Sequence, residues 1–496
     1  MNIVEPTGRA RGATPPDGEE ARKRVTVVIF GSTGNLTGVK LLPALESLLE
    51  DRVVGEDLRI VAVGRRPLDD DAYYRKMAGE LRTDLLRARI CYFQGEVDRK
   101  GGLEKLPGFL AERGLDSSNL IFYFATPPEL YETIARELVE QGLMLQEPGG
   151  PFRRAVIEKP LGNDLVSAGV LLDSIYNRLD ENQVMLVDHY LGKEAIQNLI
   201  VLRFLNETYE ATLRAEYVQD IQITISESDR IGDRGQYYDG AGVVRDMIQS
   251  HVLQIIAFLT MDKPEDNRPE SIMRNKLQAI KNVRFTTPLA DNLVLGQYRG
   301  YREENHVPPG SDTPTYIAVQ LHVEKGPLVG VPIFVRTGKA LAKKHARIVI
   351  QFKPRRSPFC GEVLAGNKIV VTIQPDAWIM FFFKHKVPGL TMGIKEVDQC
   401  FFREESFVES PREGYQRIFY EIIQGNRLLF TTPHEVIASW IFVDRLIAAA
   451  REAGIDPVSY EPGVEDLPES AAMLERAGYS WYEAWYTRSC PLGGGD

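Results

Sequence analysis

The feature that most constrains this chain is a regular alternation, from Val25 to Tyr190, of short apolar runs with stretches of helical spacing. Continuous apolar strands separated by helices are typical of a parallel sheet with both faces covered. We therefore predict a doubly wound α/β domain over residues 25–190. Its strands are expected at VTVVIF (25–30), RIVAV (59–63), ICYF (90–93), LIFYF (120–124), AVIEKP (155–160) and QVMLV (183–187).

The pattern changes after residue 190, where runs with a period of two residues take over. From Tyr316 onward these runs follow one another with little helical sequence between them, which favours a mainly antiparallel sheet. Helical patterns at 242–261 and 434–453 would cover one side of it. We predict one larger α+β domain over residues 191–485. Its strands are expected at 219–228, 316–324, 330–337, 346–352 and 368–374.

The two ends of the chain differ from the rest. Residues 1–24 are rich in Gly, Pro and charge and lack the apolar region of a signal peptide, so we expect a disordered tail. Residues 486–496 should form a loose end. No run approaches the roughly 18 apolar residues of a membrane helix, so we expect a soluble protein with no membrane partner.

Charge and cysteine usage exclude several classes of function. The net charge of −10 argues against nucleic acid as a general partner, because nucleic acid rewards a basic surface. The four cysteines are far apart and show no metal-type spacing, so we expect no metal site. Four thiols in a long chain suit a reducing compartment, and we expect a cytoplasmic protein.

A glycine-rich turn, GSTGNLTGVKLLP (31–43), directly follows the first strand and opens a helix. Gly31 permits the tight turn, and Gly34 lets the backbone approach a pyrophosphate whose charge the helix N-terminus favours. Any strand-to-helix turn can use glycine, but this strand–turn–helix context predicts a Rossmann-like dinucleotide site.

Two arginines, Arg65 and Arg66, follow the second strand, where NAD-binding domains usually carry an acid for the ribose hydroxyls. Planar guanidinium groups suit a ribose 2′-phosphate. Two solvated arginines are the alternative interpretation. Together with the glycine turn, the pair favours NADP as the cofactor.

Four side chains that can hold or move charge crowd together after the last strand of the first domain. VDHYLGKE (187–194) brings Asp188, His189, Tyr190 and Lys193 into one short stretch. A polar helix start is the plain alternative, but it leaves the cluster of four functional groups unexplained.

Four further motifs follow the glycine turn along the chain: EKPLG (158–162), DHYLGKE (188–194), VVRDMIQSHVLQ (243–254) and VRTGKAL (335–341). Together with the glycine turn they carry a resemblance to the glucose-6-phosphate dehydrogenase family, from about Val25 to the last hundred residues of the chain. DHYLGKE is a highly specific match, whereas EKP also occurs in related sugar dehydrogenases.

The chain also departs from the family pattern at two places. Gly34-Asn35-Leu36-Thr37 stands where the family usually has Gly-Asp-Leu-Ala. Vertebrate members bind a second, structural NADP near the strand that ends here in Gln374. Thr372 and His345 stand in the corresponding places, so we expect no second NADP site.

The resemblance implies oxidation of D-glucose 6-phosphate to 6-phospho-D-glucono-1,5-lactone with hydride transfer to NADP, the first step of the pentose phosphate pathway. Such a reaction needs a base of near-neutral pKa for the hydroxyl proton. On the pattern alone, His251 on an apolar helical stripe would more often be a core residue. The resemblance makes it the general base, with Asp188 fixing its tautomer.

The resemblance also assigns the binding residues. On an extended segment Asp188 and His189 would point to opposite sides, so that one serves His251 and the other faces the sugar phosphate. Asp246 and His251 can share a pocket only if Asp246 lies in the first turn of its helix, because five residues of a regular helix span about 140°.

The residues expected to bind the substrate are Lys159, His189, Tyr190, Lys193, Glu227, Asp246, Lys339, Lys344 and Gln374. Those expected to bind the cofactor are Gly31, Ser32, Gly34, Asn35, Leu36, Arg65, Arg66, Ala125, Pro127, Glu158 and Lys159.

Two alternatives stay open. An EKP-type dehydrogenase for an unphosphorylated sugar would not need His189, Tyr190 and Lys193 together. A catalytically inactive NADP-binding sensor would be marked by the loss of His251 or Asp188, and both are present. The family further suggests a homodimer or homotetramer formed through the sheet of the second domain.

Overall fold

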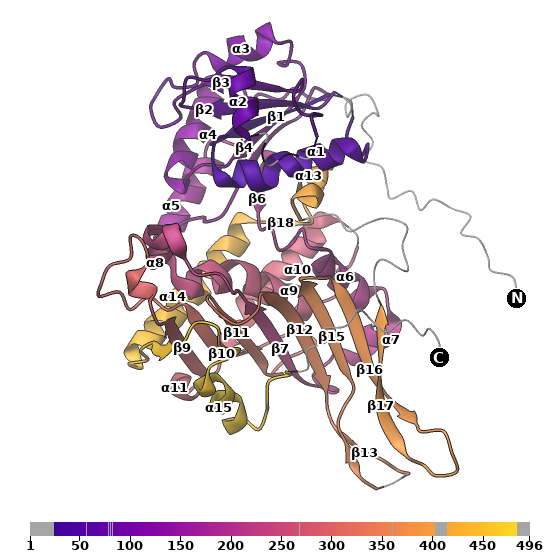
Figure 1. Cartoon of the computed structure of the whole chain (residues 1–496). Coiled ribbons are helices and arrows are strands. Elements are labelled where there is room, and N and C mark those ends of the chain that lie inside the picture. The colour runs from indigo at the N-terminus through magenta and orange to yellow at the C-terminus, as the bar shows by residue number, and fades with distance from the viewer. Residues whose placement is uncertain are drawn as a thin grey trace, which may run out of the picture. The chain divides into compact units, whose positions relative to one another are not determined.

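The computed structural model divides the chain into two compact units (Figure 1), residues 1–157 with 177–184 and residues 158–176 with 185–496. The expected tail at 1–24, except Arg24, and the expected loose end at 486–496 lie outside the described residues. The structure describes residues 24–483 apart from Glu56, Ala78, Glu80, Arg82, Asn267, Cys360 and 402–413.

The first unit is built on a parallel sheet in which the strand order is β5-β4-β1-β2-β3. Every residue of β1 and β4 is buried, as expected of central strands with both faces covered. The predicted doubly wound parallel sheet is confirmed. Its strands are β1 (Val25–Phe30), β2 (Arg59–Gly64), β3 (Ile90–Gln94), β4 (Asn119–Phe124) and β5 (Arg153–Ile157).

Helices connect these strands, as the alternating pattern predicted. The buried apolar residues of α4, for example Tyr131, Ile134 and Leu138, recur at three- and four-residue steps and so form one face of the helix. The helices of the unit are η1 (Thr37–Leu41), α1 (Leu42–Glu50), α2 (Asp70–Met77), α3 (Leu106–Glu112), η3 (Pro128–Leu130), α4 (Tyr131–Glu140) and η4 (Glu181–Gln183).

The second unit contains a long sheet of order β17-β16-β15-β12-β7-β11-β10-β9-β19, with β8 paired to β10. Its pairs are antiparallel except β7–β11 and β9–β19, so the predicted mainly antiparallel sheet is confirmed. Its strands are β7 (Val218–Ser226), β8 (Val283–Phe285), β9 (Leu293–Tyr298), β10 (Tyr316–Val323), β11 (Ile333–Gly338), β12 (His345–Phe352), β15 (Lys368–Gln374), β16 (Trp378–Lys386), β17 (Ile394–Phe401) and β19 (Val458–Tyr460).

Two short pairings complete the strands. β13 (Arg355–Arg356) and β14 (Val363–Leu364) form a separate hairpin. β6 (Val184–Val187) receives β18 (Phe430–Thr431) as an antiparallel partner, with Phe430 opposite Val187.

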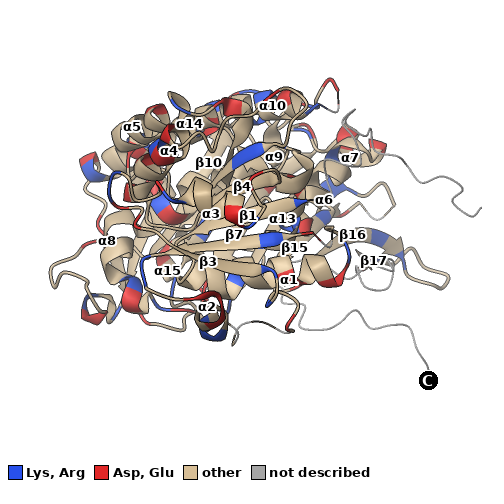
Figure 2. Ribbon diagram, turned by 90° about the horizontal axis from the view of Figure 1, so that it is seen from above, with Lys and Arg blue, Asp and Glu red and all other residues tan. Residues whose placement is uncertain are grey.

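Helices α9, α10 and α14 pack on one another along one side of the sheet of the second unit, whereas α15 packs on the other side, where Met473 and Leu474 join Tyr316 and Phe334 in a core cluster (Figure 1). Figure 2 shows acidic and basic residues along α10 and α14. No helix in the described ranges is long and apolar enough to cross a membrane. The helices are α5 (Leu165–Tyr176), α6 (Glu194–Phe204), α7 (Glu207–Thr212), η5 (Gly232–Arg234), α8 (Gly235–Val243), η6 (Val244–Val252), α9 (Leu253–Thr260), α10 (Pro269–Asn282), α11 (Leu289–Asn292), η7 (Tyr301–Glu303), α13 (Gly414–Gln424), α14 (Pro433–Glu452) and α15 (Pro468–Arg476).

Candidate active site

A buried carboxylate–imidazole pair lies at the centre of the candidate site. Asp188 directly follows β6 and His251 lies in η6. Asp188 Oδ1 is 2.6 Å from His251 Nδ1, and the two residues are only 3% and 1% exposed. With Nδ1–H donating to the carboxylate, His251 Nε2 is left as the acceptor.

The environment sets the protonation state of this pair. Burial alone would raise the pKa of Asp188, but His251, His189 and Lys159 together outweigh burial and hold that pKa far below its ordinary value. Burial lowers the pKa of His251 below its ordinary 6.5, although Asp188 acts in the opposite direction. At neutral pH the imidazole is therefore neutral beside an ionised carboxylate, which is the form a general base requires.

Lys159 lies at the open nitrogen of the imidazole. Its Nζ is 2.8 Å from His251 Nε2, and 3.1 Å and 3.3 Å from the carbonyl oxygen and Oδ1 of Asp246. Burial alone would lower the pKa of Lys159, but Asp246, Tyr237 and Asp188 together outweigh burial and raise that pKa. A charged ammonium group therefore donates to the atom at which a base would accept a proton.

Asp246 and His251 reach the same pocket because of the helix geometry between them. Gly242, with φ 63° and ψ 173°, interrupts the helix before η6, so that Asp246 falls in the first turn of η6. The segment is a π-helix, whose hydrogen bonds join residues five apart. Asp246 thus meets the predicted condition for a shared pocket, a place in the first turn of the helix. The regular-helix angle of about 140° does not apply to this segment, because a π-helix has more residues per turn.

A second acid–lysine pair extends the cluster. Glu227 and Lys339 directly follow the parallel neighbours β7 and β11, whose last paired residues are Ser226 and Gly338. Lys339 forms an ion pair with Glu227, and its Nζ is 3.7 Å from Asp246 Oδ2. Burial raises the pKa of Asp246, but Lys159 and Lys339 outweigh burial and lower it well below its ordinary value.

The residues predicted to grip a phosphate gather beside the imidazole. Lys193 Nζ is 2.6 Å from Gln374 Oε1 and 4.5 Å from the centre of the Tyr190 ring. The Tyr190 ring also stacks on that of His251, with ring centres 4.1 Å apart and planes 25° apart. Tyr190 thus contacts both the ammonium group and the imidazole.

His189 does not point away from the pair as predicted, so that expectation was wrong. Asp188–Gly192 form a turn instead of an extended segment: the Tyr190 amide donates to Asp188 Oδ1 at 3.0 Å, and the Leu191 amide to the Asp188 carbonyl at 3.0 Å. The His189 ring consequently lies 4.7 Å from the His251 ring. Burial lowers the pKa of His189 well below its ordinary 6.5, and the neighbouring His251 and Lys159 lower it further.

Lys344, which was predicted to bind substrate, does not join the cluster. Its Nζ is 3.7 Å from Asp229 Oδ2, and both side chains are exposed.

Tyr415, which was not predicted, does lie at the site. It is at the start of α13 and stacks on His189 with ring centres 6.3 Å apart. Burial raises the pKa of Tyr415, and Glu158, its hydrogen-bond partner, raises it further. No motif in the sequence marks Tyr415 as part of the site.

The glycine turn of the first unit has the geometry of a dinucleotide cradle. Gly31 has φ +77°, and a Cβ there would lie 2.2 Å from the Ala125 carbonyl oxygen, so only glycine fits. Helix begins at Asn35 and Leu36, directly after Gly34. The Ser32 and Thr126 hydroxyls are buried and have no hydrogen-bond partner among the described residues. They are suitable donors to an anion at a helix start.

The arginine pair and the end of β4 lie at the carboxyl edge of the same sheet. Arg65 and Arg66 follow β2 and are exposed; Arg65 Nη1 is 3.5 Å from Asp98 Oδ2. Ala125 follows β4, and Pro127 precedes η3. These positions match the edge at which open α/β sheets bind ligands.

Asp188, His189 and His251 also present one potential metal ligand each, all within 4.8 Å of one another. However, Asp188 Oδ1 and His251 Nδ1 already share a hydrogen bond. That bond engages one ligand atom of each of the two residues, so we interpret the group as an acid–base pair.

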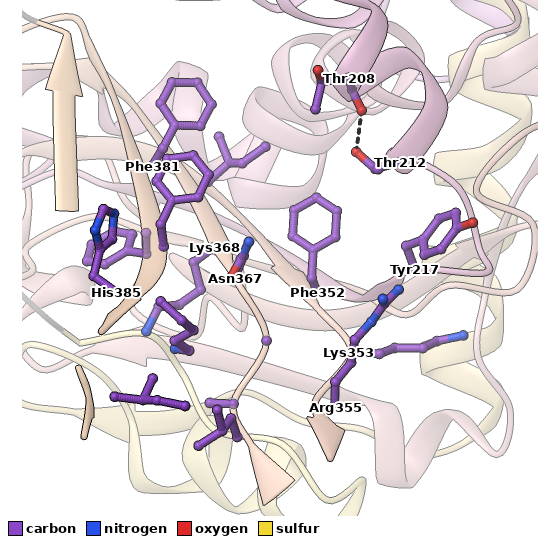
Figure 3. Close-up of a pocket in the computed structure, with 18 of the residues that line it drawn as sticks. Thr208, Thr212, Tyr217, Phe352, Lys353, Arg355, Asn367, Lys368, Phe381 and His385 are labelled. Atoms are coloured by element: carbon purple, nitrogen blue, oxygen red, sulfur yellow. Dashed lines mark hydrogen bonds between the residues drawn. The ribbon is translucent and has the colours of Figure 1, made fainter. Parts of the chain in front are cut away.

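A large hollow of about 1320 Å³ lies elsewhere in the second unit, between α7 and the ends of β12, β15 and β16 (Figure 3). Phe352, Lys353 and Lys368 line it, and none of the predicted site residues does. Cavity size alone therefore does not mark the site.

Comparison with known proteins agrees with this geometry. Two family models match: the NAD binding domain of glucose-6-phosphate dehydrogenase over residues 28–198 and the C-terminal domain of the same enzyme over 200–482. The glucose-6-phosphate 1-dehydrogenase of Chlamydia muridarum is 31% identical, covering 97% of this chain and 99% of the relative. That of Aggregatibacter actinomycetemcomitans is 33% identical, covering 92% and 96%.

Solved structures give the same result. A glucose-6-phosphate dehydrogenase in complex with glucose-6-phosphate matches with a TM-score of 0.85 at 27% identity, covering 93% of this chain and 99% of that one. The enzyme from Mycobacterium avium matches with a TM-score of 0.78, also at 27% identity and with the same coverage. The chain belongs to the glucose-6-phosphate dehydrogenase family.

Proposed function

We propose that the protein oxidises D-glucose 6-phosphate to 6-phospho-D-glucono-1,5-lactone with NADP as the hydride acceptor, the first step of the pentose phosphate pathway. The observation that carries the proposal is the buried Asp188–His251 pair, whose Nε2 opens onto Lys159 and the acid–lysine cluster. Membership of the family supports the same reaction.

His251 is the general base in this proposal. The hydroxyl on C1 of the sugar gives its proton to Nε2, the C1–O bond becomes a carbonyl, and the hydride leaves C1. Asp188 holds the reactive tautomer and stabilises the imidazolium that forms. Because Lys159 occupies Nε2 in the structure, substrate must take over this contact, while Asp246 remains to hold the ammonium group.

The remaining polar residues bind different parts of the sugar phosphate. Lys193, with His189 and Tyr190, grips the phosphate, and Gln374 holds the Lys193 ammonium group in position. Glu227 and Asp246 accept hydrogen bonds from sugar hydroxyls, because a carboxylate has acceptor oxygens and no donor. Lys339 contacts both of these acids, and Lys344 has a peripheral role at most.

The first unit fits the cofactor. The glycine turn would hold the pyrophosphate, with the hydroxyls of Ser32 and Thr126, which have no partner among the described residues, and Arg65 and Arg66 would hold the 2′-phosphate. Asn35, Leu36, Ala125 and Pro127 would complete the part of the binding site that this unit supplies. NADP, when bound, supplies the nicotinamide that accepts the hydride.

The experiment that tests this function compares initial rates with glucose 6-phosphate and glucose, each with NADP and with NAD. The proposal requires the highest kcat/KM for glucose 6-phosphate with NADP. Equal rates with glucose would favour a dehydrogenase of unphosphorylated sugars. NADP binding without turnover on any of these sugars would favour an inactive sensor.

We also propose that the enzyme works in the cytoplasm as a homodimer or homotetramer, which its family membership supports. Light scattering coupled to gel filtration tests the assembly: a mass of about 56 kDa, that of one chain, would contradict it.

A further inference from the structure

A buried polar network lies behind the Asp188–His251 pair and has no part in the chemistry described above. Lys276 of α10 and Glu435 in the first turn of α14 are both 0% exposed, and their Nζ and Oε2 atoms are 3.1 Å apart. Gln254 of α9, 2% exposed, donates to the same Glu435 oxygen at 2.9 Å. We call Lys276, Glu435 and Gln254 the buried triad.

One arm of the triad reaches the helix that carries the base. Gln254 is three residues after His251, a spacing at which two side chains of a helix are neighbours. Glu435 is itself fixed, because its amide donates to the Thr432 hydroxyl that caps α14, at 3.1 Å. The position of the helix at His251 is therefore tied to the start of α14.

The other arm reaches the strand that carries the acid. Lys276 Nζ donates to the carbonyl of Phe430, at 3.5 Å. Phe430 lies opposite Val187 in the β18–β6 pair, and Asp188 is the next residue after Val187. The hydroxyl of Thr431 adds a bond to the Leu186 carbonyl at 3.1 Å.

Stability alone does not explain the triad. Taking an ammonium and a carboxylate out of water costs free energy that their mutual attraction often fails to recover, and apolar replacement of a buried pair is often neutral or stabilising. The triad also leaves Glu435 Oε1 and Gln254 Oε1 buried without a partner among the described residues. Its directional bonds do, however, connect two segments that must be in register for a 2.6 Å contact.

We propose that Lys276, Glu435 and Gln254 are positioning residues that hold η6 and the end of β6 at the separation the Asp188–His251 hydrogen bond requires. None of the three touches substrate or cofactor in this scheme. The kinetic test of this inference rests on the proposed function. A spectroscopic measurement tests the inference independently of that function.

The decisive variant replaces the whole triad by unbranched apolar side chains of similar length, Gln254→Met/Lys276→Met/Glu435→Met. No buried charge is left unpaired, so the melting temperature should stay the same or rise. The kcat for glucose 6-phosphate should fall about 10- to 100-fold, because misplacement by about 1 Å can cost about 100-fold. The KM should change less than about twofold.

The second readout needs no substrate. A short imidazole–carboxylate hydrogen bond gives a strongly downfield proton signal, which His251→Asn would assign by removing it. The signal should be present in the wild type and lost or shifted in the triple variant. If the wild type does not oxidise glucose 6-phosphate, the proposed function fails, but this signal still tests the triad.

Two further variants keep the inference falsifiable. Gln254→Met cuts only the arm to the helix and should lower kcat several-fold with KM unchanged, even if the triple variant does not fold. Thr260→Val is the matched control, a buried polar residue of α9 that bonds only within its helix, at 2.7 Å to Ile256. It should leave kcat and the signal unchanged. A folded triple variant, or Gln254→Met, with normal kcat and an unshifted signal would overturn the inference.

Discussion

The sugar site of the second unit and the glycine turn of the first are prepared for their ligands in opposite ways. In the sugar site each principal cation already has a partner: Lys159 contacts Asp246, Lys339 contacts Glu227, and Lys193 contacts Gln374. In the glycine turn, buried hydroxyls such as that of Ser32 lack a partner among the described residues.

The difference predicts how each site responds to mutation. A substrate entering the sugar site exchanges existing contacts for new ones, so removing one residue also releases its partner and disturbs the unliganded protein. A dinucleotide at the glycine turn adds hydrogen bonds that were not there before, so a change there should affect binding without harming the empty protein.

The largest effect is expected at the base. His251→Asn retains a polar side chain but cannot accept the proton, and general-base catalysis typically supplies 10²–10⁴-fold, so kcat should fall by about that factor. The KM for glucose 6-phosphate should change little. Steady-state kinetics check this, and near-normal turnover would remove His251 from the role and reopen His189 as the base.

The next effect concerns the phosphate grip. Lys193→Ala deletes a charge-assisted contact worth about 1.5–3 kcal/mol, which corresponds to about a 10- to 150-fold rise in the KM for glucose 6-phosphate. The preference over free glucose should narrow by the same factor. Lys344→Ala is the matched control, a lysine paired with an exposed acid outside the cluster, and should change KM less. Unchanged affinity in Lys193→Ala would show that the grip is elsewhere.

The pH profile tests the environment of the base. Because the pKa of His251 lies below 6.5 in the folded protein, kcat/KM should stay constant through neutral pH and fall only at pH below 6.5, about tenfold per unit beyond the pKa. At pH values just below 6.5, His251 binds a proton in the unfolded chain but not in the folded chain. The free energy of unfolding should therefore also decrease as pH falls below about 6.5. An acid limb with a midpoint above 7 would contradict the assignment.

The arginine pair tests the cofactor side of the comparison. Arg65→Ala/Arg66→Ala should weaken NADP by about tenfold, equivalent to about 1.4 kcal/mol, and NAD far less, because only NADP carries the 2′-phosphate. Dissociation constants from fluorescence titration give both values. Equal weakening of the two cofactors would mean that the arginines do not read the 2′-phosphate.

The smallest effect sharpens the comparison. Ser32→Ala removes a hydrogen bond that forms only with the dinucleotide, so cofactor affinity should fall by about 2- to 12-fold, for about 0.5–1.5 kcal/mol. The melting temperature of the empty protein should not fall, because the buried hydroxyl has no partner to lose among the described residues. Glu227→Gln removes one of the two acids that contact Lys339 and should lower the melting temperature. Destabilisation by Ser32→Ala alone would remove the contrast between the two regions.

The strands of the first unit could be predicted from the sequence because burial on both faces leaves continuous apolar runs, as in β4. β15 was likewise predicted with its observed bounds. β16 and β17 were not predicted. These strands end the sheet and are largely half-buried or exposed, so WIMFFFKHK and IKEVDQCF show no clean alternation.

Some residues of the site could likewise be predicted from the sequence, and others could not. The short stretch DHYLGKE marked Asp188 and Lys193 as candidates. His251 became a candidate only through the family resemblance, because on its local pattern it would more often be a core residue. The orientation of His189 could not be predicted, since it depends on a turn closed by the Asp188 side chain. Tyr415 is brought in by the tertiary fold alone, with no signal in its own segment.

The double-mutant cycle on Asp188→Asn and His251→Asn tests the central claim most directly. Each single change should slow turnover, since Asn at 188 can hold the wrong tautomer and no longer offsets the imidazolium charge. If the pair acts as one unit, the double variant should lose far less in kcat than the product of the two single losses. Losses that multiply would show that the two residues act independently and would contradict the account.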